Sequence, residues 1–215
     1  DTLRWLGRFL GRIHAVGALR PFKHRPRIDI ASFGTAPARY VIEHNFVPAD
    51  LKESYAAITR DGLERVAQCY ERAGAVRNIR LHGDCHAGNI LWSGQGPHFV
   101  DLDDCRSGPA VQDLWMLLSG DAAMMSVQLA EVIGGYREFC DFNPAEINLI
   151  EALRTLRMIH YAGWLATRWD DPAFPASFPW FNTQRYWQDR VLELREQIAL
   201  MDEAPLAPVF AALRV

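Results

Sequence analysis

Hydrophobic residues at helical spacing dominate most of the chain. In residues 2–17 apolar side chains recur every three or four positions, which predicts an amphipathic helix. Residues 50–74 show the same spacing and end at Gly74, a residue suited to the C-terminal end of a helix. Similar patterns predict further helices at 110–119, 122–140, 144–169 and 182–202. The chain is therefore predicted to be mainly α-helical.

Two regions lack this spacing. Residues 21–48 contain four prolines and scattered aromatic residues, which predicts an ordered but irregular segment. Residues 79–104 hold three short β-prone runs, IRLHGD, NILW and HFVDLDD, and the SGQG sequence between the last two is typical of a hairpin turn. We therefore expect an α+β protein, mainly helical, with a small β-hairpin insert in its middle.

Composition and charge narrow the class of protein. The chain is 49% hydrophobic and 23% charged, which is typical of a soluble globular protein. A net charge of −3 gives no bulk positive field for nucleic acid or an anionic membrane. The four cysteines form no CxxC pair, and no apolar run approaches the roughly 18 to 20 residues that span a bilayer. We expect a cytoplasmic protein whose partners include neither nucleic acid nor membrane.

Polar residues gather in two short segments of the middle region. Residues 82–89, HGDCHAGN, have apolar residues on both sides, which predicts a polar loop between two buried strands. The second segment, residues 101–104, follows the predicted turn and the apolar pair Phe99–Val100. A tight hairpin would return the carboxylates of the second segment to the first loop, so we expect the two loops to share one cleft.

These two segments contain the minimum set of groups for phosphoryl transfer. That chemistry needs a carboxylate to accept a hydroxyl proton, with an amide oxygen and a second carboxylate to hold Mg²⁺. Asp84, Asn89 and Asp101 supply this set. The five-residue step from Asp84 to Asn89 matches the Asp-to-Asn step of the kinase catalytic loop. Oxygen donors also suit Mg²⁺ better than zinc.

The motifs around these residues resemble those of a known family. LHGDCHAGNILW followed by FVDLDD resembles the catalytic core of the aminoglycoside phosphotransferase and choline kinase superfamily, which has a protein-kinase-like fold. Together with GPAVQDLWMLLSG, these motifs are similar to the stress response kinase A family, which phosphorylates proteins on Ser and Thr. The resemblance implies ATP and a protein acceptor as partners and Mg²⁺ as cofactor. A small-molecule acceptor, an amino alcohol or an aminoglycoside, is the alternative.

The resemblance also implies roles for individual residues at the reaction centre. Asp84 would be the catalytic base for the acceptor hydroxyl. Asn89 and Asp101 would ligate the Mg²⁺ that bridges the ATP phosphates, so Asp101 is a catalytic residue as well as a metal ligand. His86 stands where protein kinases carry a phosphate-facing lysine, and it would contact the γ-phosphate of ATP.

Two further residues would support the site. In the stress response kinase A family, the residue that matches Asp113 lies on the helix after the catalytic loop and braces that loop. The residue that matches His82 packs at the base of that loop. We therefore expect His82 and Asp113 to hold the loop rather than to contact substrate.

As a whole, residues 1–215 resemble a kinase C-terminal lobe with three parts, a catalytic loop, a metal-binding loop and a helical remainder, at residues 81–92, 99–105 and 110–202. Lys23 and Lys52 are the only lysines, and neither lies in the apolar strand that an ATP-binding lysine requires. No glycine-rich phosphate loop precedes them. We expect the N-terminal lobe to be absent from this chain, which makes a non-catalytic C-lobe fragment or binding module an alternative function.

Three other interpretations of the motifs stay open. His82, Cys85 and His86 could form a zinc cluster, although a fourth ligand would have to come from elsewhere. The DLDD sequence resembles the start of aspartyl-phosphate hydrolases, but Cys105 stands where those proteins have Thr or Val. The aromatic residues of 164–187 predict core packing, or else an aromatic cleft that receives a cation with help from three carboxylates, Asp170, Asp171 and Asp189.

Overall fold

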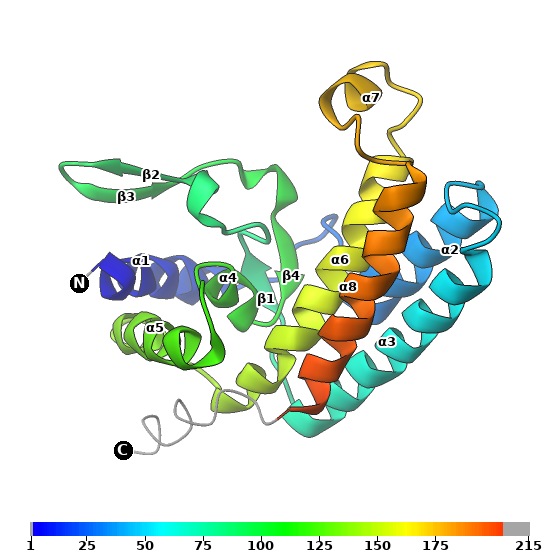
Figure 1. Cartoon of the computed structure of the whole chain (residues 1–215). Helices are drawn as coiled ribbons and strands as arrows, with labels where there is room; N and C mark the ends of the chain where they lie inside the picture. Colours follow the sequence, from blue (N-terminus) through cyan, green and yellow to red (C-terminus); the bar gives the residue numbers. More distant parts are fainter. Residues whose placement is uncertain (1, 204–215) are drawn as a thin grey trace. The chain divides into compact units, whose positions relative to one another are not determined.

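The computed structural model describes residues 2–203, and these form two compact units (Figure 1). The first unit comprises residues 2–28 and 73–150, and the second comprises 29–72 and 151–203. Helices dominate both units, which confirms the mainly helical prediction. None of the helices formed by residues 2–203 is both long and apolar enough to cross a membrane.

A pair of helices forms the base of the first unit. The predicted helix 2–17 is confirmed as α1 (Thr2–Gly17), which packs along α5 (Ala122–Tyr136). The two helices approach so closely that their backbones touch. A Cβ atom at Gly7 would collide with the carbonyl oxygen of Val132, so a larger residue at this position would push the helices apart. This packing holds α1 against α5, a helix that is distant from it in the sequence.

Two small antiparallel sheets complete this unit. The predicted hairpin is confirmed, because β2 (Ile90–Ser93) pairs with β3 (Gly96–Phe99) around the glycine-containing turn. The other sheet pairs β1 (Ile79–Leu81) with β4 (Arg106–Gly108). The β-prone run HFVDLDD is a strand only as far as Phe99. Its last three residues form the short 3-10 helix η3 (Leu102–Asp104).

Strand β4 was not predicted, because Arg-Ser-Gly contains no β-branched or aromatic residue. It forms because neighbours hydrogen-bond to both of its sides. On one side it pairs with β1. On the other side Ser107 donates its backbone N–H to Pro26 O at 3.1 Å and accepts the N–H of Ile28 at 2.8 Å.

The remaining helical segments of the first unit are η2 (Ala87–Asn89), which is a single turn within the predicted polar loop, α4 (Val111–Trp115) and η4 (Pro144–Leu149). The helices predicted in this unit after residue 109 are shorter in the structure. The predicted helix 110–119 ends at Trp115, and the predicted helix 122–140 ends at Tyr136, directly after two glycines, which are weak helix formers. The predicted helix 144–169 is divided into the 3-10 helix η4 and the α-helix α6 (Ile150–Ala166).

The second unit is a helical assembly around an aromatic core. Its helices besides α6 are η1 (Ile30–Thr35), α2 (Ala36–Glu43), α3 (Lys52–Ala73), α7 (Ala173–Ser177) and α8 (Gln184–Asp202). Gly74 follows α3 with a φ of 66°, as predicted for a glycine at the end of that helix. Trp187 and Tyr55 are fully buried and meet edge to face, with ring centroids 5.2 Å apart.

The prediction that residues 21–48 are irregular was wrong for residues 30–43. Asp29 accepts the N–H of Ser32 at 2.8 Å and so caps η1, a π-helical turn that continues into α2. Pro37 lies in the first turn of α2, where a missing N–H costs no hydrogen bond. The proline was interpreted as a helix breaker although it stands at a helix start.

Candidate active site

The polar loop 82–89 is fixed at its start by α4. The buried carboxylate of Asp113 accepts two consecutive backbone N–H groups, from His82 at 2.8 Å and from Gly83 at 2.9 Å. The amide of Gln112 donates to the carbonyl oxygen of Gly83 at 3.2 Å. These hydrogen bonds to His82 and Gly83 are here called the clamp. Asp84 is the next residue along the chain, so the clamp fixes the position of its backbone.

A network of buried side chains holds the Asp113 carboxylate in place. His14 Nε2 lies 2.9 Å from Asp113 Oδ2, and His14 Nδ1 lies 3.0 Å from the hydroxyl of Tyr136. All three side chains are fully buried, and a buried carboxylate is tolerated only when it is hydrogen-bonded or paired. Neither His14 nor Tyr136 was predicted from the sequence to support the site. The available signal was a histidine on the apolar face of the first helix.

Gly83 brings the two polar loops into contact. Its φ is 88°, in the left-handed region that favours glycine. A Cβ atom at this position would collide with the carbonyl oxygen of Asp104, so only glycine allows the catalytic loop to lie directly against η3. This contact confirms that the two loops lie against each other, and that they share one cleft stays a prediction.

The hairpin brings Asn89 and Asp101 together. Ile90 pairs with Phe99, and the ladder continues with a 3.0 Å hydrogen bond from Val100 N–H to the carbonyl oxygen of Asn89. Asp101 is the next residue. The amide of Asn89 also donates to the carbonyl oxygen of Asp84 at 3.0 Å. The structure therefore assembles Asp84, Asn89 and Asp101 at the open end of the hairpin, and it holds Asp101 at a φ of 60°, which is uncommon outside glycine.

His82 connects the two loops through its ring. Its Nε2 lies 2.8 Å from the carbonyl oxygen of Val100, and its Nδ1 accepts the N–H of Asp84 at 3.4 Å. Burial raises the pKa of the neighbouring Cys85 thiol, as do the charges of Asp113 and Asp84, so this cysteine stays protonated. Both ring nitrogens of His82 are bonded to the backbone, and among residues 2–203 His82, Cys85 and His86 do not gather as a group that could hold a metal ion, so the zinc cluster interpretation was wrong.

His86 is half-buried and its ring lies beside Asp84. Its Nδ1 accepts the N–H of Gly88 at 3.0 Å, which in a neutral ring leaves the proton on Nε2. That nitrogen lies 3.5 Å from Asp84 Oδ2, and the side chain is 42% exposed. His86 thus presents an N–H donor beside the carboxylate, where it could reach a bound anion.

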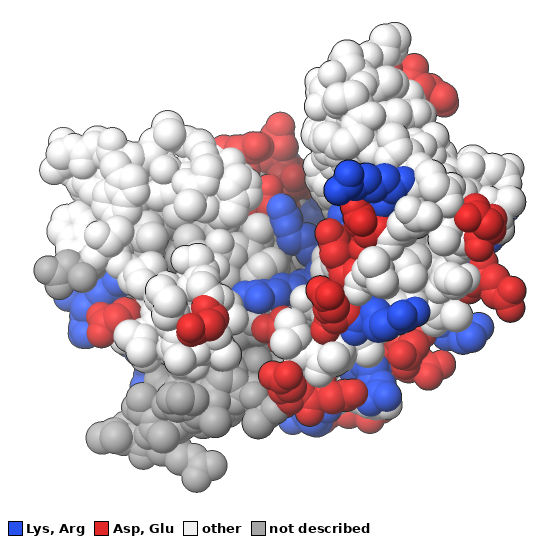
Figure 2. Space-filling model, viewed as in Figure 1, with Lys and Arg blue, Asp and Glu red and all other residues white. Residues whose placement is uncertain are grey.

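The strand after the loop is not buried as predicted. Ile90 lies in the core, but Leu91 and Trp92 are 56% and 52% exposed. Hairpin β2–β3 has only two strands, so it lacks a neighbouring strand that would cover these side chains. Figure 2 shows a surface without Lys, Arg, Asp or Glu in the place where Figure 1 draws this hairpin.

The donor set fits a magnesium ion held together with a nucleotide. The amide nitrogen of Asn89 is bonded to the backbone, which leaves its side-chain oxygen as a donor, and the Asp101 residue is exposed. Mg²⁺ is usually held by one or two protein carboxylates together with substrate phosphates and water. Among residues 2–203 no three His, Cys, Asp or Glu side chains gather as a metal site. An ion at this position would therefore take further ligands from the substrate.

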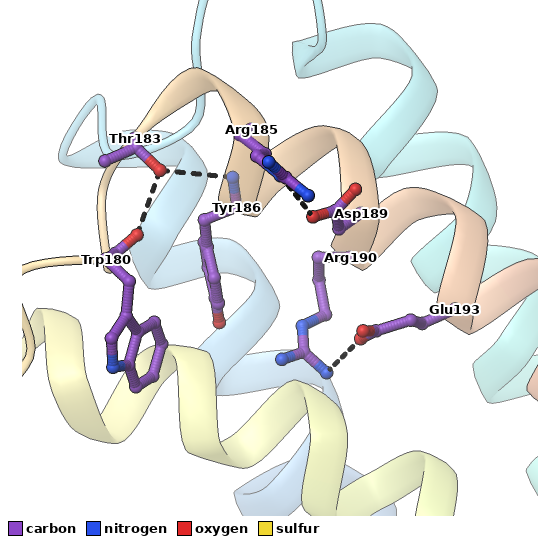
Figure 3. Close-up of a pocket in the computed structure, with 7 residues that line it drawn as sticks. All are labelled: Trp180, Thr183, Arg185, Tyr186, Asp189, Arg190 and Glu193. Carbon is purple, nitrogen blue, oxygen red and sulfur yellow. Dashed lines mark hydrogen bonds and ion pairs between the residues drawn. The ribbon is translucent and has the colours of Figure 1, made fainter.

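The second unit contains a separate pocket of about 300 Å³ beside the start of α8 (Figure 3), lined by Trp180, Thr183, Arg185, Tyr186, Asp189, Arg190 and Glu193. Both carboxylates are already paired, Asp189 with Arg185 at 3.5 Å and Glu193 with Arg190 at 3.0 Å. The guanidinium of Arg190 also lies over the Tyr186 ring, 5.2 Å from its centroid. Core packing is confirmed for Phe181 and Trp187, and the pocket has no unpaired negative charge for a cation.

Comparisons with known proteins agree with this geometry. Residues 1–150 match the phosphotransferase enzyme family. Stress response kinase A from Salmonella choleraesuis strain SC-B67 is 46% identical over 206 residues, which is 96% of this chain and 62% of the relative. The serine/threonine protein kinase RdoA of Salmonella typhimurium strain LT2 shows the same identity and coverage, and stress response kinase A of Escherichia coli K12 is 45% identical.

Solved structures show the same fold at low sequence identity. The amicoumacin kinase hAmiN, in complex with AMP-PNP, Ca²⁺ and Ami, superimposes with a TM-score of 0.62 at 16% identity, over 95% of this chain and 60% of that one. A microcompartment-associated aminopropanol kinase gives a TM-score of 0.61 at 15% identity, over 97% and 63% of the two chains.

The match over residues 1–150 shows that the chain belongs to the phosphotransferase enzyme family, and its fold is that of the solved kinases. Its relatives named stress response kinase A confirm the resemblance that the LHGDCHAGNILW and VDLDD motifs predicted. The chain spans 62% of the length of these relatives.

Proposed function

We propose that the protein is a kinase that uses ATP and Mg²⁺ to phosphorylate Ser or Thr residues of a protein acceptor. One observation carries this proposal: the amide of Asn89 bonds to the backbone of Asp84, the hairpin ladder brings Asp101 next to Asn89, and the buried Asp113 holds the two residues before Asp84. The names of the sequence relatives support a protein as the acceptor.

Asp84 is the base in this proposal. Its carboxylate accepts the proton of the Ser or Thr hydroxyl as the hydroxyl oxygen attacks the γ-phosphorus. The bond between that phosphorus and the bridging oxygen breaks, and ADP leaves with the electron pair. The clamp on His82 and Gly83 keeps the Asp84 backbone from moving during this step, which preserves the orientation of the base.

The other residues position the phosphates. Asn89 and Asp101 would hold the Mg²⁺, which neutralises charge on the ATP phosphates when it is bound. The Nε2–H of His86 would donate to a γ-phosphate oxygen from its place beside Asp84. His82 and Asp113 would act only through the loop backbone that they bind.

The experiment that tests the base is Asp84→Asn in the full-length protein. Phosphoryl transfer to the acceptor should fall by at least about 100-fold, while binding of a fluorescent ATP analogue changes little. Asp103→Asn, an exposed carboxylate in the adjacent loop, is the matched control and should keep full transfer. Loss of nucleotide binding in the Asp84 variant, or unchanged transfer, would remove Asp84 from the role of base.

The acceptor class needs its own measurement. Radiolabelled ATP is incubated with the protein and either a Ser/Thr protein substrate or a panel of amino alcohols and aminoglycosides. Label in protein that depends on Asp84 supports the protein kinase. Label only in small molecules would contradict the protein acceptor, and no transfer by the full-length protein to either class would favour a non-catalytic binding module.

A further inference from the structure

The segment that follows α1 concentrates positive charge on the surface. Residues 20–27, here called the basic segment, contain five exposed basic side chains, Arg20, Lys23, His24, Arg25 and Arg27. Between residues 2 and 28 the sequence has no Asp or Glu. Neither Arg20 nor Lys23 forms an ion pair with any carboxylate in the described part of the chain. The charges of Arg20 and Lys23 are therefore not neutralised by an ion pair within residues 2–203.

The basic segment is held in a fixed position. Its last residues run beside β4, where Pro26 and Ile28 exchange backbone hydrogen bonds with Ser107. At its other end the guanidinium of Arg80 lies over the Phe22 ring, 5.6 Å from the ring centroid. These contacts hold the backbone of the segment against the first unit, so its exposed side chains project from a fixed stretch of chain.

The basic segment adjoins the candidate active site. Arg25 donates a hydrogen bond from Nη1 to the carbonyl oxygen of Asp103. The carbonyl oxygen of the next residue, Asp104, is the atom against which Gly83 of the catalytic loop packs. The carboxylate of Asp104 is itself paired with Arg106 at 2.6 Å, so it does not offset the charge of the segment. Positive charge thus borders the loop that carries Asp101.

We propose that the basic segment recognises acidic side chains beside the Ser or Thr that is phosphorylated. This inference rests on the proposed kinase function and adds a substrate class to it. An acceptor peptide whose hydroxyl reaches Asp84 would place neighbouring residues over the adjoining loops, where Glu or Asp would meet Arg20 and Lys23. The chain carries a net charge of −3, which disfavours extended nucleic acid binding and leaves a short acidic peptide as the matching partner.

The test uses two peptides that differ only in having Glu or Gln around one Ser, with the full-length protein and Mg-ATP. We expect the Glu peptide to have the lower KM, and added salt to reduce its advantage. In the double variant R20A/K23A the ratio of kcat/KM between the two peptides should fall by about threefold to tenfold. The matched control is R60A/R195A, two exposed arginines of the second unit, which should keep the parental ratio.

Binding of fluorescent versions of both peptides without ATP separates this inference from the proposed function. A preference for the Glu peptide that R20A/K23A abolishes supports the acidic-substrate site even if no phosphoryl transfer is detected. Equal binding of the two peptides by the parental protein overturns it. The same conclusion follows if the ratio of the two peptide affinities in R20A/K23A equals the parental ratio. Displacement of the Glu peptide by a single-stranded oligonucleotide or by anionic lipid vesicles at equal charge concentration would also overturn it, in favour of that other partner.

Discussion

The carboxylate of Asp113 and the backbone N–H of Gly83 are joined by a 2.9 Å hydrogen bond across a sequence separation of 30 residues. Both groups are buried, and the same carboxylate binds the next N–H toward the N-terminus. The helix that carries Asp113 therefore determines where the catalytic loop begins, and through it where Asp84 lies. Four predictions follow from the contacts around this bond.

Asp113→Asn should destabilise the protein and impair transfer. Asn keeps one oxygen acceptor but turns an NH₂ group toward a backbone N–H that then has no acceptor. The free energy of unfolding should fall by about 2 to 4 kcal/mol, measured by urea denaturation, and kcat should fall with it. An exposed substitution, Asp103→Asn, is the control for the loss of one carboxylate. A fully stable Asp113→Asn protein would show that the clamp is not needed.

Gly83→Ala should lower stability by about 2 kcal/mol or more. The added methyl group would meet the carbonyl oxygen of Asp104, and alanine disfavours a φ of 88°. Gly94→Ala is the matched control, because a Cβ atom there has open space around it, and its effect should stay within about 0.5 kcal/mol. Thermal unfolding of both variants gives the comparison, and equal melting temperatures would contradict the close contact between the loops.

Asn89→Ala should raise the Mg²⁺ requirement of the proposed reaction. Removal of the side-chain oxygen takes away one proposed ligand, so the Mg²⁺ concentration for half-maximal transfer should rise by about tenfold or more. The measurement is a magnesium titration at saturating ATP. Asn78→Ala, an exposed asparagine of the same unit, should leave the titration unchanged. An unchanged titration for the Asn89 variant would exclude it as a ligand.

Glu146 should make stability depend on pH. Burial raises its pKa from 4.5 to about 7, although hydrogen bonds from the backbone of Val111 and Ala110 act in the opposite direction. The pKa of Glu146 is higher in the folded state than in the unfolded state, so protonation of Glu146 stabilises the fold. This contribution to the free energy of unfolding is complete below about pH 4.5 and is lost as the pH rises through about 7. This difference corresponds to about 3 kcal/mol in the free energy of unfolding.

Glu146→Gln tests this pH dependence. The amide is neutral at every pH, so the decline of stability between about pH 5 and about pH 8 should become shallower in urea denaturation. Glu131→Gln, on the exposed side of α5, controls for the removal of one carboxyl group. If Glu146→Gln and the parent lose stability equally over this range, Glu146 is not the titrating group. Because Glu146 accepts the N–H of Val111 at the start of α4, the same variant also reports on the helix that holds Asp113.

Much of the fold could be predicted because its signals are local. The periodicity of residues 2–17 and 52–73 and the glycine-containing turn before Gly96 each depend on neighbouring residues only. The failures have two different causes. Pro37 was interpreted as a breaker because composition does not show on which side of a proline a helix begins, and the exposure of Trp92 depends on what covers a strand rather than on its sequence.

The sequence by itself determined which residues make up the candidate site. The residue types and spacing of Asp84, Asn89 and Asp101 are properties of the chain, and so is the hairpin that returns one to the other. Only the tertiary structure decided how the site is held. Asp113, His14 and Tyr136 come from three helices, with His14 separated by 99 residues from Asp113 and by 122 from Tyr136, and β4 forms only because two distant segments pair with it. A buried carboxylate must find its partners in space, and no local pattern in a sequence records which residues those are.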